Sequence, residues 1–216
     1  VIEGSGTAIY SVDYRDLDGD GRQEILVSWK VGPEVQALSV FTLRLGTPRE
    51  LMNSSYIRYA AADLDGDGRE EILTFRADEQ GAGTADYYAW TGDGTLAPAG
   101  VARLSMTMAE LSAGQVLSGT LRGGEPAVFA TGVSDSRIQV TDVLALRQGE
   151  LGNLTVSDST GVSREIYRYL GLFPTDIDGD GVTELPVPQD LLPSGDTESG
   201  CRIRWRSYDA AGTGED

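Results

Sequence analysis

The chain contains no histidine and a single cysteine, Cys201, among its 216 residues. Without histidine, neither a Ser-His-Asp nor a Cys-His catalytic arrangement can form, and the usual zinc sites lose their nitrogen ligand. One cysteine cannot form a disulfide within the chain. Because Cys201 begins a stretch typical of a strand, residues 201–205, we expect it to pack as a small buried residue.

Long apolar runs are also missing. No stretch approaches the roughly 18 apolar residues of a membrane-spanning helix, so we expect no membrane span. Basic residues are scarce, with 17 lysines and arginines against 34 acidic residues, which gives a net charge of −17. A surface of that sign repels phosphates, so we expect neither nucleic acid nor an anionic membrane as a partner.

What the chain does have is an acidic nine-residue stretch that occurs three times. Each copy has acidic residues at positions 1, 3, 5 and 9, glycines at positions 4 and 6, and an apolar run after position 9. Four acids in each of three copies make up twelve of the 34 acidic residues, so much of the negative charge lies in these stretches. The acidic residues are Asp16, Asp18, Asp20 and Glu24; Asp63, Asp65, Asp67 and Glu71; and Asp176, Asp178, Asp180 and Glu184.

This spacing is typical of a loop that binds a hard divalent cation. Ca²⁺ takes about six to eight oxygen ligands, and alternate carboxylates on a tightly curled loop can converge on one point. Glycine at position 6 permits the sharp turn. We expect three structural Ca²⁺ sites, each bound by the four acidic side chains and by the backbone carbonyl of position 7, which is Arg22, Arg69 or Val182.

Two other interpretations of the acidic stretches are weaker. Asp-Gly pairs can simply form polar hairpin turns, but three copies with identical acid spacing disfavour that explanation. An EF-hand requires a bidentate glutamate at position 12 and a helix on each side. Position 12 is Val27, Thr74 or Val187, and the flanking residues are typical of strands.

With its last acid at position 9, directly before a predicted strand, each stretch resembles the calcium loops of FG-GAP/VCBS-type β-propeller repeats. Such repeats occur in integrin α-subunit propellers and in many secreted bacterial proteins. The resemblance is specific in the three loops and looser between them. It implies an extracellular scaffold whose variable loops bind proteins or glycans.

The position-9 glutamates also predict the number of repeats. Glu24 and Glu71 are 47 residues apart, whereas Glu71 and Glu184 are 113 apart, about two periods. Residues 119–129 keep the glycines, Glu125 and the apolar run but have lost the aspartates, so we expect a repeat there without metal. Periods of this length are typical of four-stranded propeller blades.

We therefore expect one all-β domain over residues 1–216, of the β-propeller type, built from four blade-like repeats of four-stranded antiparallel sheets. Either four blades close a ring, with residues 1–4 or a nearby strand completing the last blade, or the chain is part of a larger propeller. An incomplete blade would leave an edge open to self-association. The repeats are expected at about 5–53, 54–105, 106–158 and 159–209, followed by a frayed tail at 210–216.

Within a blade, the strand before the loop should be innermost, and small residues such as Ala60, Ala61 and Ala62 suit that place. The strand after the loop should be buried on both faces. We expect the tryptophans Trp29, Trp90 and Trp205 to pack between blades, with stacking on a sugar as the alternative. We also expect strands at 109–117, 154–157 and 167–173 and a long exposed loop at 188–200.

These features favour a calcium-stabilised extracellular or cell-surface module that presents loops to a protein or glycan partner, because such loops fill where calcium is about millimolar. The candidate surface lies away from the calcium loops, at residues 30–36, 77–85 and 133–137. A polysaccharide lyase or hydrolase is one alternative, although each acid cluster is already assigned to a metal loop and we assign no catalytic residue. A purely structural module of a larger surface protein is the other.

Overall fold

The computed structural model describes residues 4, 6–32, 35–156, 161–190 and 201–216. They form an all-β fold of four antiparallel sheets with one short helix. The first sheet has the order β1-β2-β3-β4 and the second β5-β6-β7-β8. The strands of the first sheet are β1 (Ala8–Arg15), β2 (Glu24–Lys30), β3 (Gln36–Arg44) and β4 (Thr47–Tyr56). Those of the second are β5 (Arg58–Ala62), β6 (Glu71–Ala77), β7 (Gly83–Trp90) and β8 (Leu96–Arg103).

The third sheet has five strands and the fourth has three. The third has the order β12-β11-β10-β9, and β13 pairs with the far end of β11. Its strands are β9 (Gln115–Thr120), β10 (Pro126–Val133), β11 (Ile138–Arg147), β12 (Glu150–Asn153) and β13 (Ile166–Arg168). The fourth sheet contains β14 (Leu185–Asp190), β15 (Cys201–Tyr208) and β16 (Gly214–Glu215).

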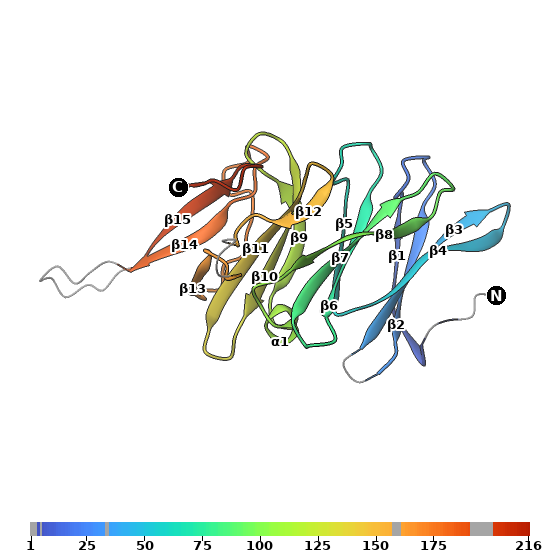
Figure 1. The fold of residues 1–216 in the computed structure, drawn as a ribbon, viewed down its shortest axis with the longest axis horizontal. Helices are drawn as coiled ribbons and strands as arrows, with labels where there is room; N and C mark the ends of the chain where they lie inside the picture. The colour runs from blue at the N-terminus through green and yellow to red at the C-terminus, as the bar shows by residue number, and fades with distance from the viewer. Residues whose placement is uncertain (1–3, 5, 33–34, 157–160, 191–200) are drawn as a thin grey trace, which may run out of the picture.

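The four sheets follow one another in chain order along the longest axis of the molecule (Figure 1). The N- and C-terminal ends lie at opposite ends of this row. Within the described residues the sheets therefore form an open row and not a closed four-bladed ring. Among these residues, no helix is long and apolar enough to cross a membrane.

Hydrophobic cores lie between successive sheets, and the second strands of the second and third sheets, β6 and β10, each contribute to two of them. In β6, Ile72 packs in the core shared with the first sheet, whereas Leu73 packs in the core shared with the third. In β10, Val128 faces the second sheet and Phe129 the fourth. All four side chains are fully buried. Burial on both faces explains why these strands are apolar throughout and do not alternate.

The predicted strand at 109–117 is wrong in its first half. The structure has the helix α1 (Met108–Ser112) there, and β9 begins only at Gln115. A capping box starts the helix: Thr107 accepts a hydrogen bond from the Glu110 N–H, and the Glu110 carboxylate accepts one from the Thr107 N–H. The Thr-x-x-Glu spacing that produces this cap is visible in the sequence.

Two further strand predictions are displaced. The strand expected at 154–157 lies earlier, as β12, because Gln148 and Gly149 both have positive φ and form a two-residue hairpin turn. The strand expected at 167–173 is only β13, and it joins the third sheet by pairing with β11. The fourth sheet therefore has no full strand before its acidic loop, apart from the isolated bridge between Thr175 and Glu184.

The tail predicted to be frayed is instead held against the last two sheets. Its strand β16 pairs with Ser207 and Tyr208 of β15. The Arg206 side chain donates to Asp216 at 2.6 Å, and Arg122 forms an ion pair with Glu215. The loop predicted at 188–200 lies partly in β14, and residues 191–200 fall outside the described chain, as do residues 1–3 of the segment considered for ring closure.

Replacing Phe129 with alanine tests the core between the third and fourth sheets. Phe129 is fully buried, so Phe129→Ala is expected to lower the free energy of unfolding by about 3–5 kcal/mol in chemical denaturation. The control is Val101→Ala on β8, where the side chain is 61% exposed and the expected change is within about 0.5 kcal/mol. Equal effects of the two substitutions would contradict the core assignment.

Candidate metal centres and an adjoining groove

Three acidic loops, here called the first (16–24), second (63–71) and third (176–184) loop, share one hydrogen-bonding pattern. The aspartate at position 1 accepts from the N–H of position 6, at 2.9 Å in the first loop, 3.0 Å in the second and 2.9 Å in the third. The aspartate at position 3 accepts from the N–H of position 5, and that at position 5 from the N–H of position 7. The glycines at positions 4 and 6 all have positive φ. Each chain segment is thus curled around its own carboxylates.

The glutamate at position 9 points back into its loop. Its carboxylate accepts the N–H of position 2: Leu17 donates to Glu24 at 3.0 Å, Leu64 to Glu71 at 2.9 Å and Ile177 to Glu184 at 3.1 Å. Glu24 and Glu71 are 1% exposed and Glu184 8%. A carboxylate buried in this way requires compensating partners, and the backbone N–H supplies only part of the compensation. Glu24 has a further hydrogen bond, with the Thr42 side chain, and burial still raises its pKa.

In each loop, carboxylate oxygens from positions 1, 3 and 9 lie within 4.8 Å of one another. These groups are Asp16, Asp18 and Glu24; Asp63, Asp65 and Glu71; and Asp176, Asp178 and Glu184. They are three of the predicted ligands in every loop, and the donor set is of hard oxygens only. That chemistry fits Ca²⁺, which prefers carboxylate and carbonyl oxygens.

The predicted ligands at positions 5 and 7 are not part of these groups. In the second loop the Asp67 carboxylate forms an ion pair with Arg69, and the hydrogen bond from Arg69 lowers the pKa of Asp67. Asp20 and Asp180 accept N–H groups within their own loops. A role for these aspartates, and for the carbonyls of Arg22, Arg69 and Val182, stays a prediction.

The electrostatics of the loops favour a bound cation. Burial raises the pKa of Glu71 to about 7, and the nearby carboxylates of Asp65, Asp67 and Asp63 also raise it. Burial likewise raises the pKa of Glu24 and of Glu184. Each position-9 carboxylate is thus costly to ionise without a positive charge beside it.

In the third sheet, a shorter turn takes the place of the acidic loop and connects β9 to β10. The Leu121 N–H donates to the backbone carbonyl of Glu125 at 2.7 Å, and Gly123 and Gly124 between them have positive φ. Leu121 is fully buried, as Leu17 is in the first loop, whereas the Glu125 side chain is exposed. A carbonyl here takes the place that a buried carboxylate has in the acidic loops.

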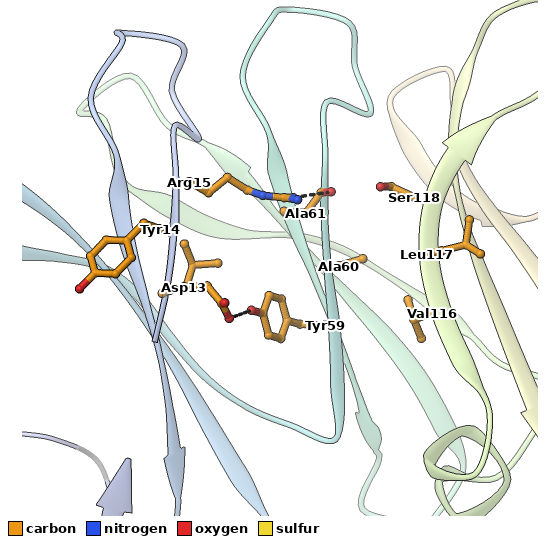
Figure 2. Close-up of a pocket in the computed structure, with 10 residues that line it drawn as sticks. Asp13, Tyr14, Arg15, Tyr59, Ala60, Ala61, Val116, Leu117 and Ser118 are labelled. Carbon is orange, nitrogen blue, oxygen red and sulfur yellow. Dashed lines mark hydrogen bonds between the residues drawn. The ribbon is translucent and has the colours of Figure 1, made fainter. Parts of the chain in front are cut away.

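Below the first and second loops, a groove of about 530 Å³ runs between β1, β5 and β9 (Figure 2). Figure 2 shows Asp13 and Arg15 directed into it from β1, and Tyr14 directed away from it. The Tyr59 hydroxyl donates to Asp13 at 3.0 Å, and Arg15 donates to the Ala61 carbonyl at 3.3 Å. The groove therefore combines a carboxylate and a guanidinium from the first sheet with a phenol from the second.

A second cavity of about 320 Å³ shares Asp13, Tyr59 and Val116 with the groove and extends it along β1. Its lining adds Tyr10, whose side chain is 69% exposed, and Arg58. Burial and the hydrogen bond to Asp13 raise the pKa of Tyr59 above its usual range. Tyr59 is thus a hydrogen-bond donor at neutral pH and a poor base. The extended groove offers aromatic faces and polar groups together, which suits a polar ligand with apolar faces.

The aromatic residues that sequence reasoning singled out lie elsewhere. Trp29 is 8% exposed and donates to Ser39, and Trp90 is half-buried, donates to the Glu70 carbonyl and has the Arg69 guanidinium over its ring. Trp90 packs against the core between the first and second sheets, as expected, whereas Trp29 packs within the first sheet against Val27, Ala37 and Phe41 and not between sheets. The groove tyrosines Tyr10 and Tyr59 were not anticipated, because nothing in the sequence shows that β1 and β5 face a common space.

The loops predicted as the partner surface lie at the edge of the sheets opposite the acidic loops (Figure 1). They are the β2–β3, β6–β7 and β10–β11 connections, and residues 33–34 of the first lie outside the described chain. Their role stays a prediction.

Neither a protein-family model nor a curated protein sequence matches the chain. Solved structures that share its fold include three rhamnogalacturonan lyases, and these do not bear on the FG-GAP/VCBS resemblance. Bacillus licheniformis rhamnogalacturonan lyase PL11 has a TM-score of 0.52 and 20% identity, over 82% of this chain and 39% of that one. The exotype rhamnogalacturonan lyase YesX has a TM-score of 0.55 and 20% identity, over 96% and 40%. Rhamnogalacturonan lyase YesW has a TM-score of 0.55 and 18% identity, over 96% and 42%. The chain thus spans about two fifths of the length of these structures.

Substitution of a loop glycine tests the curled backbone without any metal. Gly68 has φ +89, so Gly68→Ala is expected to lower the free energy of unfolding by about 1–2 kcal/mol in chelator. Gly92 also lies in an open turn, with nothing within 4 Å of an added Cβ and no positive φ, so Gly92→Ala is expected to be neutral within about 0.5 kcal/mol. A neutral Gly68→Ala would refute the loop conformation.

Proposed function

We propose that this chain is a calcium-stabilised part of an extracellular, polysaccharide-active protein, and that a saccharide binds in the groove between β1, β5 and β9. The observation that carries the proposal is the likeness of fold to three rhamnogalacturonan lyases over most of this chain, together with a groove of aromatic and polar side chains. The open row of sheets is then one part of a larger β-propeller-type arrangement.

The three acidic loops are proposed to bind Ca²⁺ as structural ions. Support comes from the convergence of three carboxylates in every loop and from the burial of the position-9 glutamate. Bound Ca²⁺ would neutralise these carboxylates and fix each turn at the start of a central strand. Weak calcium loops of this kind fill at about millimolar calcium, which favours an extracellular location.

Within the groove we propose binding and not proton abstraction. The hydroxyl of Tyr59 already donates to Asp13, and the Arg15 guanidinium is already paired with Glu70. A tyrosine with a raised pKa stays protonated at neutral pH and so is not available to accept a proton. The second candidate function, a binding module without any enzymatic activity, is favoured by this same observation, and turnover assays on the saccharides that bind would separate the two.

Calcium content should follow the loop carboxylates. Chelator-stripped protein is expected to take up about three Ca²⁺ in a calorimetric titration, with a rise in melting temperature. Asp18→Ala and Asp65→Ala are each expected to lose one ion by elemental analysis, since each removes a carboxylate from its cluster. Glu125→Ala, which removes an exposed carboxylate, should keep all three. An unchanged count in the aspartate variants would contradict the ligand assignment.

Saccharide binding should depend on the groove tyrosines. Against a panel of acidic and neutral polysaccharides in affinity electrophoresis, Tyr10→Ala is expected to weaken binding by about 1 kcal/mol, roughly five-fold, by removing an exposed aromatic face. The control is Ile9→Ala on the same strand, since Ile9 is 58% exposed and is not among the residues that line the groove or its extension. Equal losses in both variants would place the binding surface elsewhere.

A further inference from the structure

The first and second loops touch each other through their backbones. The Glu70 N–H, at position 8 of the second loop, donates to the Leu17 carbonyl, at position 2 of the first, at 2.6 Å. A Cβ added to Gly19 would lie 3.0 Å from the Gly68 carbonyl oxygen, so the tips of the two loops also approach closely. Neither loop can change shape without disturbing the other.

The Arg15 side chain links the first and second loops through hydrogen bonds. Its guanidinium donates to the Ala61 carbonyl at 3.3 Å (Figure 2). It also donates to the Glu70 carboxylate at 3.1 Å. Glu70 directly precedes the cluster carboxylate Glu71, and Ala61 lies two residues before Asp63. Arg15 itself directly precedes Asp16, so one side chain contacts both ends of the second loop while its backbone leads into the first.

The third loop has a different neighbour. Its position-8 residue, Thr183, donates its N–H to the Thr120 carbonyl at 2.8 Å, and Thr120 leads into the short turn that ends at Glu125. The residue before its first aspartate is Thr175, so no arginine occupies the place of Arg15. Among the described residues, the acidic clusters lie only in the three loops, which leaves the third loop without a neighbouring cluster.

We propose that Arg15 is a positioning residue that couples the first and second loops, so that they bind calcium cooperatively while the third loop fills independently. The proposal rests on calcium binding by the loops. A cation that orders one loop also fixes the Arg15 and Leu17 contacts of the other, so the second cation has less disorder to overcome. Repulsion between the two cations opposes this effect, but the shared ordering makes the larger contribution to the coupling.

Calcium titration calorimetry on the chelator-stripped full chain tests the coupling. Asp178→Asn disables the third loop and leaves the first two, and its isotherm is expected to be cooperative. Adding Asp18→Asn leaves only the second loop, whose affinity is expected to be at least about five-fold weaker than when the first loop is filled. The third loop, measured alone in Asp18→Asn/Asp65→Asn, should keep its wild-type affinity.

The role of Arg15 is tested by Arg15→Gln in the Asp178→Asn background. This change is expected to make the two remaining sites independent, with melting followed to show that the chain stays folded. Arg44→Gln, which removes an exposed arginine of β3, is the charge-matched control and should leave the cooperativity unchanged.

The possible outcomes separate this inference from the proposed function. Three sites that titrate independently, negative cooperativity, or cooperativity that survives in Arg15→Gln would each overturn the coupling while leaving calcium binding intact. An absence of any calcium binding would overturn both proposals.

Discussion

The structure depends on the buried glutamate that closes each acidic loop. Glu24 and Glu71 are the first residues of β2 and β6, and Glu184 directly precedes β14. Each carboxylate accepts a hydrogen bond from the N–H of the residue that follows the first aspartate of its loop. That bond ties the beginning of the loop to the beginning of the strand. It also places a carboxylate in a desolvated position beside two aspartates, which is why burial raises the pKa of all three glutamates. A cation is the simplest compensation for this arrangement.

The central strands then carry the packing of the whole row. Because β6 and β10 are buried on both faces, each holds two neighbouring sheets in place. A loop that fixes the start of such a strand therefore influences two hydrophobic cores. The third sheet shows that a cation is not the only solution, since a backbone carbonyl at Glu125 accepts the Leu121 N–H and the carboxylate is left in solvent. The turn is thus closed by a glutamate carboxylate in the acidic loops and by a backbone carbonyl in the third sheet.

The sequence predicted most of what depends on local pattern. The all-β class, the apolar strands after the loops and the curled acidic loops follow from residue spacing over about ten residues. The errors lie where longer-range pairing decides: Ile166–Arg168 joins the third sheet because β11 offers a free length of strand, and the tail is held by Arg122 and Arg206. The helix at Met108 was missed although Thr107 and Glu110 form a recognisable capping box. The groove could not be predicted from the sequence, because Asp13, Tyr59 and Val116 are distant in sequence and come together only through the order of the sheets.

The groove and the loops belong to one structural unit, since Arg15 lines the groove and contacts the second loop. Calcium in the loops would therefore stabilise the wall of the proposed saccharide site as well as the sheets. The most direct test of this account is an anomalous difference map from crystals grown with calcium. It is expected to show three peaks, each among the carboxylates of positions 1, 3 and 9, and none at the turn that ends at Glu125. A map without peaks in the acidic loops would contradict the central claim.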